Sequence, residues 1–370
     1  MIKFATIFRD FEKIHLTKDV GMIPMAMTKI TGQRSNIFYW CRKNSVDVEI
    51  FRDLVELRPI MARGRLHFIF KVLMVIIRER FTVVNVYHLK NETLIISFLL
   101  NLLSIGVYLK LDMDTTGIDH LRKKLNSVIY RAVLSYIVKK IHFISVESRS
   151  ILNELKKLNT GFAHTKLITN AILTETVLAP RADFCYRENI ILISGRIGVH
   201  QKNHELILSS LELIDDLQDW NIVFAGPVED DFWGRVEKSK ISAMVKNRIK
   251  FVGELNRKEI FELYSKTKVF LLPSRREGFS LALLEAAYMG CYIVATDVGG
   301  VGEVTKDGDF GSIFPQEDTY ELSNIIRTII NGELDIATSY DRRVSYIEAT
   351  FDIERNLRRI NWNKINGRSI

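Results

Sequence analysis

Short apolar runs alternate with helical patterns through the second half of the chain. Each run is rich in residues that favour β-strands, and most runs are followed closely by a glycine. Between the runs, residues 259–265 and 281–289 have the spacing of helices. Strands that alternate with helices in this order form parallel sheets with right-handed connections. The predicted strands are residues 189–193, 221–224, 249–252, 268–272 and 292–296.

The first half of the chain shows the same alternation in a less regular form. The apolar run at 94–109 is 16 residues long. A membrane-spanning helix needs about 20 residues, so we interpret the run as a buried helix followed by a strand. A segment that lies on a membrane surface is the alternative. The predicted helices are residues 20–30, 92–103 and 119–137, and the predicted strands are residues 2–8, 36–41, 46–51, 107–111, 141–146 and 166–172.

These patterns predict an α/β protein with two doubly wound, Rossmann-like domains. A chain of 370 residues is long enough for two domains, and 47% hydrophobic with 26% charged residues is typical of globular proteins. Residues 179–181 have the composition of a linker. We predict a first domain over residues 1–180 and a second over residues 181–344, followed by a tail with a helical pattern.

Positive charge is concentrated in the first half. Residues 1–180 contain 27 Lys and Arg against 15 Asp and Glu, a net charge of +12, whereas residues 181–370 contain 25 against 29, a net charge of −4. This asymmetry predicts that the first half meets an anionic surface, such as membrane phospholipid or a lipid pyrophosphate, unless the charges only face solvent. Nucleic acid is not expected, because the basic residues are not interleaved with aromatic ones. The best candidates for a membrane contact are Arg122-Lys123-Lys124 and Lys139-Lys140.

The three cysteines, Cys41, Cys185 and Cys291, are widely separated and form no Cys-x-x-Cys pair. Such spacing fits a reducing compartment and predicts no zinc site. The apolar stretch at residues 1–8 is too short, and too soon charged, for a secretory signal peptide. We therefore expect a cytoplasmic protein, which could lie peripherally on the inner face of the membrane.

The stretch at 273–287 contains the first candidate site. It follows a predicted strand and leads into a predicted helix, so that Glu277 lies in the loop and Glu285 within the helix. Ligands of parallel sheets bind at the carboxyl ends of the strands. The backbone N–H groups of residues 278–280 would be free at the helix start, where they suit an anion. Two carboxylates beside such a site predict a ligand with both hydroxyl and phosphate groups, such as a nucleotide sugar.

The loop after the first strand of the second domain contains two cations, Arg196 and Lys202. Both can neutralise a diphosphate, the arginine through its forked guanidinium and the lysine as a point charge. A pair of solvated cations is the simpler interpretation when the loop is taken alone, because 52 Lys and Arg are spread along the chain. The presence of Glu277 and Glu285 in the same predicted sheet makes a diphosphate site the more specific interpretation.

Residues 189–315 resemble the nucleotide-binding domain of retaining glycosyltransferases of the GT-B fold, family 4. The resemblance covers about a third of the chain, and the first half is similar only in its order of strands and helices. In that fold two Rossmann-like domains face a cleft, and the C-terminal helix, here about 345–370, crosses back to the first domain. The motifs that carry the resemblance are Gly195-Arg196 with Lys202-Asn203, Phe251-Val252-Gly253, Glu277 with Glu285, and Val298-Gly299-Gly300 with Glu303.

The resemblance implies a role for each candidate residue. Arg196 and Lys202 would bind the diphosphate of a UDP- or GDP-type nucleotide sugar and stabilise the leaving nucleotide as negative charge develops. Glu285 would accept hydrogen bonds from the ribose hydroxyls, and Glu277 would contact the transferred sugar or support the departing group. The other donor-site residues would be Gly278, Phe279 and Ser280 at the sugar and phosphate, Gly253 at the base, and Gly21 of the first domain across the cleft.

One position departs from the family pattern. The family often has a histidine near the reacting carbon where this chain has Asp112, although the register leaves Asp114 as an alternative. Asp112 would act as an electrostatic stabiliser or base, or would only orient the acceptor. Asp112-Met113-Asp114 could instead hold a divalent metal. No third ligand is evident, and in this family the two cations replace the metal, so we expect neither a metal nor a cofactor.

The predicted function is that of a retaining hexosyltransferase. It would move a hexose from a nucleotide diphosphate sugar to a hydroxyl of a saccharide acceptor, lipid-linked because the first half is basic, in polysaccharide or glycoconjugate biosynthesis. Two alternatives stay open. One is a glycosyltransferase-like partner subunit without activity, and the other is a metal-dependent transferase that uses Asp112 and Asp114.

Overall fold

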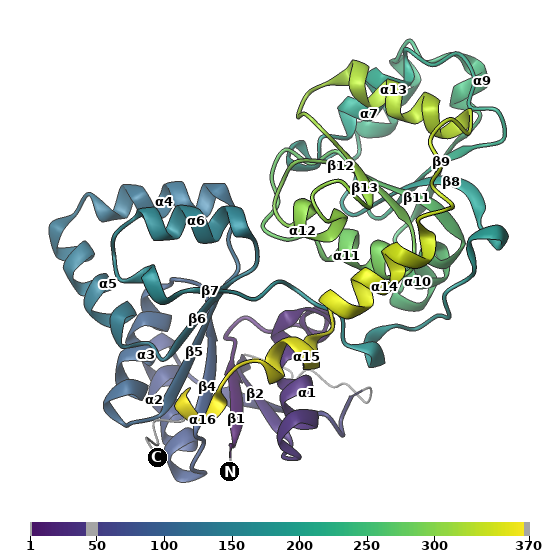
Figure 1. The fold of residues 1–370 in the computed structure, drawn as a ribbon. Helices are drawn as coiled ribbons and strands as arrows, with labels where there is room; N and C mark the ends of the chain where they lie inside the picture. Colours follow the sequence, from purple (N-terminus) through teal and green to yellow (C-terminus); the bar gives the residue numbers. More distant parts are fainter. Residues whose placement is uncertain (1, 42–50, 366–370) are drawn as a thin grey trace. The chain divides into compact units, whose positions relative to one another are not determined.

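The computed structural model describes residues 2–41 and 51–365. Its internal contacts divide the chain into two compact units (Figure 1). Unit 1 contains Met1–Leu173 together with Asp352–Ile370, and unit 2 contains Thr174–Phe351. Each unit is a parallel β-sheet with helices on both faces, so the predicted α/β class with two parallel sheets is confirmed.

Within the described residues, unit 1 is built on a seven-stranded sheet in the order β3-β2-β1-β4-β5-β6-β7. Neighbouring strands are parallel throughout. The strand order therefore runs outward from β1 in both directions, as in doubly wound sheets. The strands are β1 (Phe4–Ile7), β2 (Ser35–Cys41), β3 (Val55–Met61), β4 (Val83–Tyr87), β5 (Gly106–Leu111), β6 (Phe143–Val146) and β7 (Lys166–Leu167).

Helices cover both faces of this sheet (Figure 1). On one face α1 packs against α15 of the C-terminal segment, and on the other face α3 packs against α2 and α5. Buried aliphatic side chains of β4, β5 and β6 form a core with those of α2, α3 and α5. The helices are α1 (Asp19–Thr31), α2 (Arg65–Arg78), α3 (Asn91–Leu102), α4 (Thr115–Leu125), α5 (Val128–Lys140), α6 (Arg149–Lys157), α15 (Ile353–Arg358) and α16 (Trp362–Ile365), with short 3-10 turns η1 (Lys13–Thr17) and η2 (Phe162–His164).

Unit 1 differs from the sequence predictions in several places. The single helix predicted for 119–137 is wrong: α4 and α5 are separate helices, because the Ser127 hydroxyl accepts the Tyr130 N–H and so begins a new helix. Strands β3 and β4 and helix α2 were not predicted. β3 is an edge strand of mixed polarity that contains Pro59. The strand predicted for 46–51 lies outside the described residues, except that Phe51 is in a turn.

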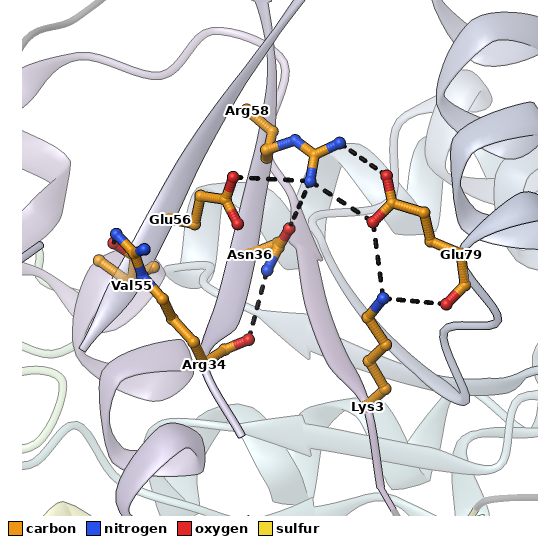
Figure 2. Close-up of polar contacts among 7 residues, drawn as sticks. All are labelled: Lys3, Arg34, Asn36, Val55, Glu56, Arg58 and Glu79. Atoms are coloured by element: carbon orange, nitrogen blue, oxygen red, sulfur yellow. Dashed lines mark hydrogen bonds and ion pairs between the residues drawn. The ribbon is translucent and has the colours of Figure 1, made fainter. Parts of the chain in front are cut away.

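A polar cluster joins α2 to the start of this sheet (Figure 2). Glu79, at the end of α2, accepts a hydrogen bond from Arg58 of β3 at 2.7 Å. The Lys3 ammonium donates to the Glu79 carbonyl oxygen at 2.9 Å and lies 3.5 Å from its carboxylate. The Arg58 guanidinium also donates to the Asn36 side chain of β2 at 3.3 Å. The hydrogen bond from Arg58 lowers the pKa of Glu79, so this carboxylate is charged and engaged.

Unit 2 is built on a six-stranded parallel sheet in the order β10-β9-β8-β11-β12-β13 within the part of the chain that the structure describes. β8 and β11 are neighbours, so the loop that follows β8, with Arg196 and Lys202, and the loop that follows β11, with Glu277, leave the same edge of the sheet. The strands are β8 (Glu188–Ser194), β9 (Asn221–Ala225), β10 (Ile249–Gly253), β11 (Thr267–Leu272), β12 (Tyr292–Thr296) and β13 (Gly311–Phe314).

The helices of unit 2 also lie on both faces of its sheet (Figure 1). α7 packs against α13 on one face, and α10 packs against α11 on the other. The strands and helices predicted for the second half are all present, whereas β13, α8, α9, α12 and α13 were not predicted. The helices are α7 (His204–Leu211), α8 (Phe232–Lys238), α9 (Ala243–Lys246), α10 (Arg257–Lys266), α11 (Leu281–Tyr288), α12 (Val301–Thr305), α13 (Thr319–Ile330) and α14 (Tyr340–Thr350), with 3-10 turns η3 (Thr174–Thr176), η4 (Phe184–Tyr186) and η5 (His200–Lys202).

The C-terminal segment returns to unit 1, as predicted. α15 packs against α1, and Glu354 of α15 forms an ion pair with Lys29 of α1. Trp362 of α16 lies edge-on to Phe4 of β1 and Tyr108 of β5, with ring centroids 5.8 and 5.9 Å apart. The tail is broken into α14, α15 and α16 rather than one helix, and residues 366–370 of the prediction lie outside the described residues.

The long apolar run of the first half forms α3 and β5, as predicted from its length. Across 2–41 and 51–365, the helices are all too short or too polar to cross a bilayer. Cys41 and Cys291 are buried, Cys185 is exposed, and all three are free thiols.

Unit 1 contains a buried charge cluster beside the end of β5. The Lys110 side chain is 1% exposed, and its ammonium lies 3.0 Å from Glu147 Oε1 and 3.7 Å from Asp19 Oδ2. It also donates to Asn170 Oδ1 at 3.1 Å. Burial raises the pKa of Glu147 well above its usual range, although the nearby Lys110 opposes this. Both carboxylates therefore depend on the charge of Lys110 to remain buried.

We expect Lys110→Met to lower the free energy of unfolding by about 3–5 kcal/mol, because it leaves two buried carboxylates without their cation. Lys157→Met is the matched control: it removes a largely exposed partner of Glu154, 2.7 Å away, and should cost less than about 1 kcal/mol. Urea unfolding followed by circular dichroism measures both values. Equal, small losses in the two variants would contradict the role of Lys110.

Unit 2 contains a buried histidine that fixes the loop before α7. The His204 ring lies edge-on to Phe224 and Phe232, and its Nδ1 accepts a hydrogen bond from the Gly198 N–H at 3.0 Å. Burial, together with the charge of Lys202, lowers the pKa of His204 to about 3. The imidazole is therefore neutral in the folded chain, and it serves as a structural acceptor rather than as a ligand.

This histidine should make stability depend on pH. Below its ordinary pKa of about 6.5 the unfolded chain binds a proton there and the folded chain does not, so the free energy of unfolding should fall as the pH falls. The loss from His204 should reach about 2 kcal/mol between about pH 7 and pH 5. His204→Asn keeps a hydrogen-bond acceptor but cannot bind the proton. Between about pH 7 and pH 5 the free energy of unfolding of the variant should therefore rise relative to that of the wild type by the same amount. Denaturant unfolding across this range would contradict a neutral imidazole if the difference between the two proteins stayed constant.

Candidate functional site

Two glycine turns shape the carboxyl edge of the unit 2 sheet. After β8 the chain turns at Gly195, with a φ of 139°, and after β9 it turns at Gly226, with a φ of 138°. A Cβ on Gly226 would lie 1.9 Å from the Gly195 carbonyl oxygen, so the two backbones touch. Only glycine permits both the conformation and the approach. Arg196 follows directly, with an exposed side chain that has no hydrogen-bond or ion-pair partner in 2–41 or 51–365.

The remainder of the loop after β8 positions Lys202. The turn η5 ends at Asn203, whose backbone is left-handed, with a φ of 55°, and whose side-chain amide donates to Glu317 at 3.3 Å. The next residue is the buried His204, so the chain is anchored immediately after the lysine. With both ends of η5 fixed, the Lys202 ammonium reaches the loop after β11.

The loop after β11 is tied to its neighbours on both sides. The Arg275 N–H donates to the Gln201 carbonyl oxygen at 2.9 Å, and the Gln201 side-chain amide donates to the Arg276 carbonyl oxygen at 2.9 Å. On the other side the Thr296 hydroxyl, at the end of β12, donates to the Ser274 carbonyl oxygen at 2.6 Å. Loops from three strands therefore hold Glu277 in place.

Glu277 and Lys202 form an ion pair. Glu277 Oε1 accepts hydrogen bonds from the Lys202 ammonium and the Ser274 hydroxyl, both at 2.7 Å. The two charged side chains are only 10% and 20% exposed. The structure thus brings together two residues that were predicted from separate motifs, whereas within the described residues Arg196 forms no hydrogen bond or ion pair with either of them.

The start of α11 leaves backbone N–H groups available, at the position where an anion was expected. Ser280 caps the helix: its hydroxyl accepts the Leu283 N–H at 3.3 Å. The Phe279 ring is buried and lies 6.1 Å from the Phe351 ring. The N–H groups of Gly278, Phe279 and Ser280 donate to no acceptor in the described part of the chain. The helix start is therefore rigid and electrostatically positive.

Glu285 is buried within α11 and has a cationic partner. Arg257, the first residue of α10, donates to Glu285 Oε1 at 2.9 Å and to the Thr176 carbonyl oxygen at 3.0 Å. Burial raises the pKa of Glu285, and the charge of Arg257 opposes this. A buried carboxylate requires a partner, and sequence reasoning did not find Arg257. The Asn256-x-x-Glu259 capping box, which marks a helix start directly after β10, was the available signal.

Gly253 lies at the end of β10, on the same edge of the sheet. Its backbone is left-handed, with a φ of 72°, and its carbonyl oxygen accepts the Gly226 N–H at 2.7 Å. The side chain of Val252 before it is exposed. The candidate base-binding segment is thus joined through Gly226 to the loop of Arg196.

Gly21 belongs to the first turn of α1 in unit 1, and packing explains why it is a glycine. A Cβ on Gly21 would lie 2.2 Å from the Leu16 carbonyl oxygen of η1. Its own N–H donates to the Lys18 carbonyl oxygen at 2.9 Å. The close approach of η1 to α1 therefore requires glycine here whether or not a ligand binds.

Asp112 and Asp114 follow β5 in unit 1 and do different things. Asp112 is exposed, whereas Asp114 caps α4, accepting the Gly117 N–H at 2.9 Å. Among the described residues no cluster of three or more His, Cys, Asp and Glu side chains could hold a metal ion. His88, after β4, lies with its Nδ1 3.3 Å from the Asp112 carbonyl oxygen. Sequence reasoning missed His88 because it follows a strand that was not predicted.

Comparison with known proteins identifies unit 2 first. Residues 183–350 match the family model of glycosyl transferases group 1. The lipopolysaccharide core biosynthesis mannosyltransferase LpcC of Rhizobium leguminosarum bv. viciae is 29% identical over 165 residues, which make up 44% of this chain and 46% of that protein. The chain therefore spans about half the length of this curated relative.

Solved structures match both units. Sucrose-phosphate synthase from Thermosynechococcus elongatus has a TM-score of 0.74 at 14% identity, over 98% of this chain and 99% of that chain. HepE of Anabaena in complex with UDP has a TM-score of 0.75 at 15% identity, over 98% and 99%. At this identity the likeness concerns the fold, two Rossmann-like parallel sheets of seven and six strands within the described residues. Together, these comparisons show that the chain has the GT-B fold and that residues 183–350 match glycosyl transferases group 1.

Proposed function

We propose that this protein is a retaining hexosyltransferase, which moves a hexose from a UDP- or GDP-type nucleotide sugar to a hydroxyl of a saccharide acceptor. The match of residues 183–350 to glycosyl transferases group 1 supports sugar transfer from a nucleotide sugar. The mannosyltransferase LpcC supports a hexose, and the UDP bound by HepE supports a nucleotide diphosphate. The acceptor would be lipid-linked, and the reaction would belong to polysaccharide or glycoconjugate assembly on the cytoplasmic face of a membrane.

The observation that supports this proposal best is the ion pair between Lys202 and Glu277, 2.7 Å long at the edge of a parallel sheet. In the empty site the lysine and the carboxylate neutralise each other, and each can bind a group of the donor instead when the donor is present. A diphosphate can take the ammonium, and a sugar hydroxyl can then donate to the carboxylate that the ammonium leaves. The same site can therefore be electrically balanced with and without the donor.

The cations would act on the leaving group. When the bond between the anomeric carbon and the diphosphate oxygen breaks, negative charge develops on the diphosphate. Arg196 has no ion pair to break within residues 2–41 and 51–365, and Lys202 has one. The N–H groups at the start of α11 add positive potential without any rearrangement. These groups can do the work for which other transferases use a divalent metal.

The carboxylates would orient the donor. Glu285 uses Oε1 for Arg257, which leaves Oε2 to accept the ribose hydroxyls. Glu277 would hold the transferred hexose, and the segment ending at Gly253 would hold the base through its backbone. In unit 1, Asp112 would stabilise positive charge at the anomeric carbon or orient the acceptor, with His88 beside it. Metal-dependent transfer through Asp112 and Asp114 has less support, because Asp114 is engaged as the cap of α4.

We expect Lys202→Ala to lower kcat/KM for the nucleotide sugar roughly 100- to 1,000-fold, the usual cost of removing one group that stabilises developing negative charge. Glu277→Gln, which keeps the size of the side chain, should also lower it. Lys238→Ala, at an exposed lysine of α8, is the matched control and should leave it unchanged. Radiolabelled sugar transfer measures all three variants.

The same assay separates the alternatives. Activity that survives EDTA would exclude the metal-dependent transferase. Full activity of both Lys202→Ala and Glu277→Gln would overturn the proposed mechanism. A wild-type chain without activity toward any donor and acceptor, but required by an active partner, would favour the inactive subunit.

Nucleotide binding can be tested without an acceptor. A nucleotide diphosphate present at about 100 times its Kd should stabilise the folded chain by about 2.7 kcal/mol, and differential scanning fluorimetry should register this as a higher Tm with UDP or GDP. The Tm shift should be much smaller in Arg196→Ala, because the variant lacks one of the two cations proposed to bind the diphosphate. The side chain has no structural partner in the described residues, so the substitution should not itself destabilise the fold. If neither nucleotide, nor any nucleotide sugar, raised the Tm of the wild type, the donor site would be wrongly assigned.

A further inference from the structure

Unit 1 contains a basic groove that none of the donor-site residues lines. It has a volume of about 540 Å³ and lies between the starts of α2 and α3 and the last turn of α4. Four cations line it, Arg9, Arg65, Lys90 and Lys124, and one carboxylate, Glu92. A groove of this size in which cations outnumber carboxylates four to one fits an anionic group.

The charges of the groove are only partly balanced. Arg9 is paired with both Asp10 and Glu92, and Lys90 lies 3.9 Å from Asp10. Arg65 and Lys124 are exposed and have no carboxylate partner among the described residues. The four cations and two carboxylates leave a net charge of +2. Two positive charges that no carboxylate balances favour the binding of a phosphate group.

The backbone adds to this potential. α2 starts after Gly64 and α3 starts after Lys90, and neither helix has a side-chain cap at its N-terminus. Both helices are longer than three turns, and both present their first residues to the groove: Arg65 and Leu66 of α2, and Asn91 and Glu92 of α3. Their uncapped N–H groups reinforce the attraction that the side-chain cations supply.

An apolar stripe runs along α2 away from the groove. Leu66, which lines the groove, begins it, and Phe70, Met74 and Ile77 continue it at helical spacing. These four side chains are between 45% and 75% exposed. A monomeric water-soluble protein rarely leaves so many large apolar side chains exposed in one row.

The surroundings of the stripe are positively charged. Lys71 and Arg78 lie on the same helix. The one carboxylate at its end, Glu79, is already engaged by Arg58 and Lys3 (Figure 2). A helix with an apolar face and flanking cations matches the interface of an anionic lipid layer.

The groove also leads toward the candidate acceptor residues. A smaller hollow of about 50 Å³ shares Arg9, Lys90 and Glu92 with it and reaches His88. His88 in turn contacts the backbone of Asp112, at the end of β5. A ligand whose phosphate lies in the groove could therefore extend, within unit 1, toward His88 and Asp112, the residues expected beside the reacting hydroxyl.

We propose that this groove binds the phosphate of an amphiphilic lipid, the lipid of the acceptor, while its hydrocarbon chain lies along the α2 stripe. The cations and the apolar residues adjoin at Leu66, and a lipid phosphate is the ligand that uses both. A soluble phosphate would gain nothing from Phe70 or Met74. The inference rests on the proposed function, in that it names the acceptor's anchor, but it concerns residues that the donor site does not use.

The test is co-flotation of the full chain with phosphatidylcholine vesicles that do or do not contain phosphatidylglycerol. We expect binding only to the anionic vesicles. Arg65→Gln with Lys124→Gln should lower the partition coefficient roughly tenfold to thirtyfold, because each cation near an anionic surface contributes strongly. The matched control, Lys156→Gln with Lys166→Gln, removes the same charge from exposed positions of unit 1 away from the groove and should lower it much less.

A second pair of variants tests the apolar part. Phe70→Ser with Met74→Ser should weaken binding to the anionic vesicles without a change in net charge. Equal losses in the groove variant and its charge control would show only general attraction and would overturn the proposal, as would no vesicle binding by the wild type. Inorganic phosphate or an oligonucleotide that bound through Arg65 and Lys124, when vesicles did not, would also overturn it.

The outcome is separable from that of the proposed function. The groove variants should retain the full Tm shift with UDP or GDP, because the groove is in unit 1 and the candidate donor residues that bind the diphosphate are in unit 2. If the nucleotides caused no shift while the vesicle results held, the donor assignment would fail and the lipid site would stand. If the shift held and vesicle binding failed, only the lipid site would be lost.

Discussion

The contact on which the candidate site depends is the ion pair between Lys202 and Glu277. It joins the loops after β8 and β11, two strands that are neighbours in the sheet. The backbone fixes the geometry of this ion pair, because η5 ends at the left-handed Asn203 and the following side chain, His204, is buried. A pair held so closely keeps the site neutral when it is empty. A ligand that separates Lys202 from Glu277 must give each of them a new partner. The site therefore favours ligands that carry both an anionic group for the lysine and a hydrogen-bond donor for the carboxylate.

Buried carboxylates follow the same rule in both units. Glu285 of α11 depends on Arg257 from α10, and Glu147 depends on Lys110 from β5. In each case burial raises the pKa of the carboxylate, and a single nearby cation opposes the shift. The difference lies in what surrounds them. Arg257 remains partly exposed, so its pair borders solvent, whereas Lys110 is buried inside unit 1.

The fold could be predicted largely from hydrophobic pattern, and most reliably where strands are buried on both sides. β8, β9, β11 and β12 read as continuous apolar runs, and their boundaries were predicted within a residue or two. β3 escaped because an edge strand needs fewer apolar residues and tolerates Pro59. The break between α4 and α5 depends on one local hydrogen bond of Ser127, which periodicity does not register.

The candidate site was predictable to the extent that its residues lie in local motifs. Glu277, Lys202 and the start of α11 all follow strand ends that the pattern locates. Partnerships between distant segments were out of reach: Arg257 and Glu285 are 28 positions apart, and His88 and Asp112 are 24 apart. Such pairs are decided by strand order and register, which a single sequence does not specify.

The contact between Gly195 and Gly226 has a consequence for anyone who diversifies this protein. Because the two backbones touch, position 226 cannot accept a side chain, whereas the neighbouring position 196 has an exposed side chain with room to vary. In a library of variants with both loops randomised, most chains would carry a side chain at position 226 and would not fold. Substitutions in these loops are therefore restricted at the two glycines and freer at the positions beside them, so any change in ligand preference would have to leave Gly195 and Gly226 unaltered.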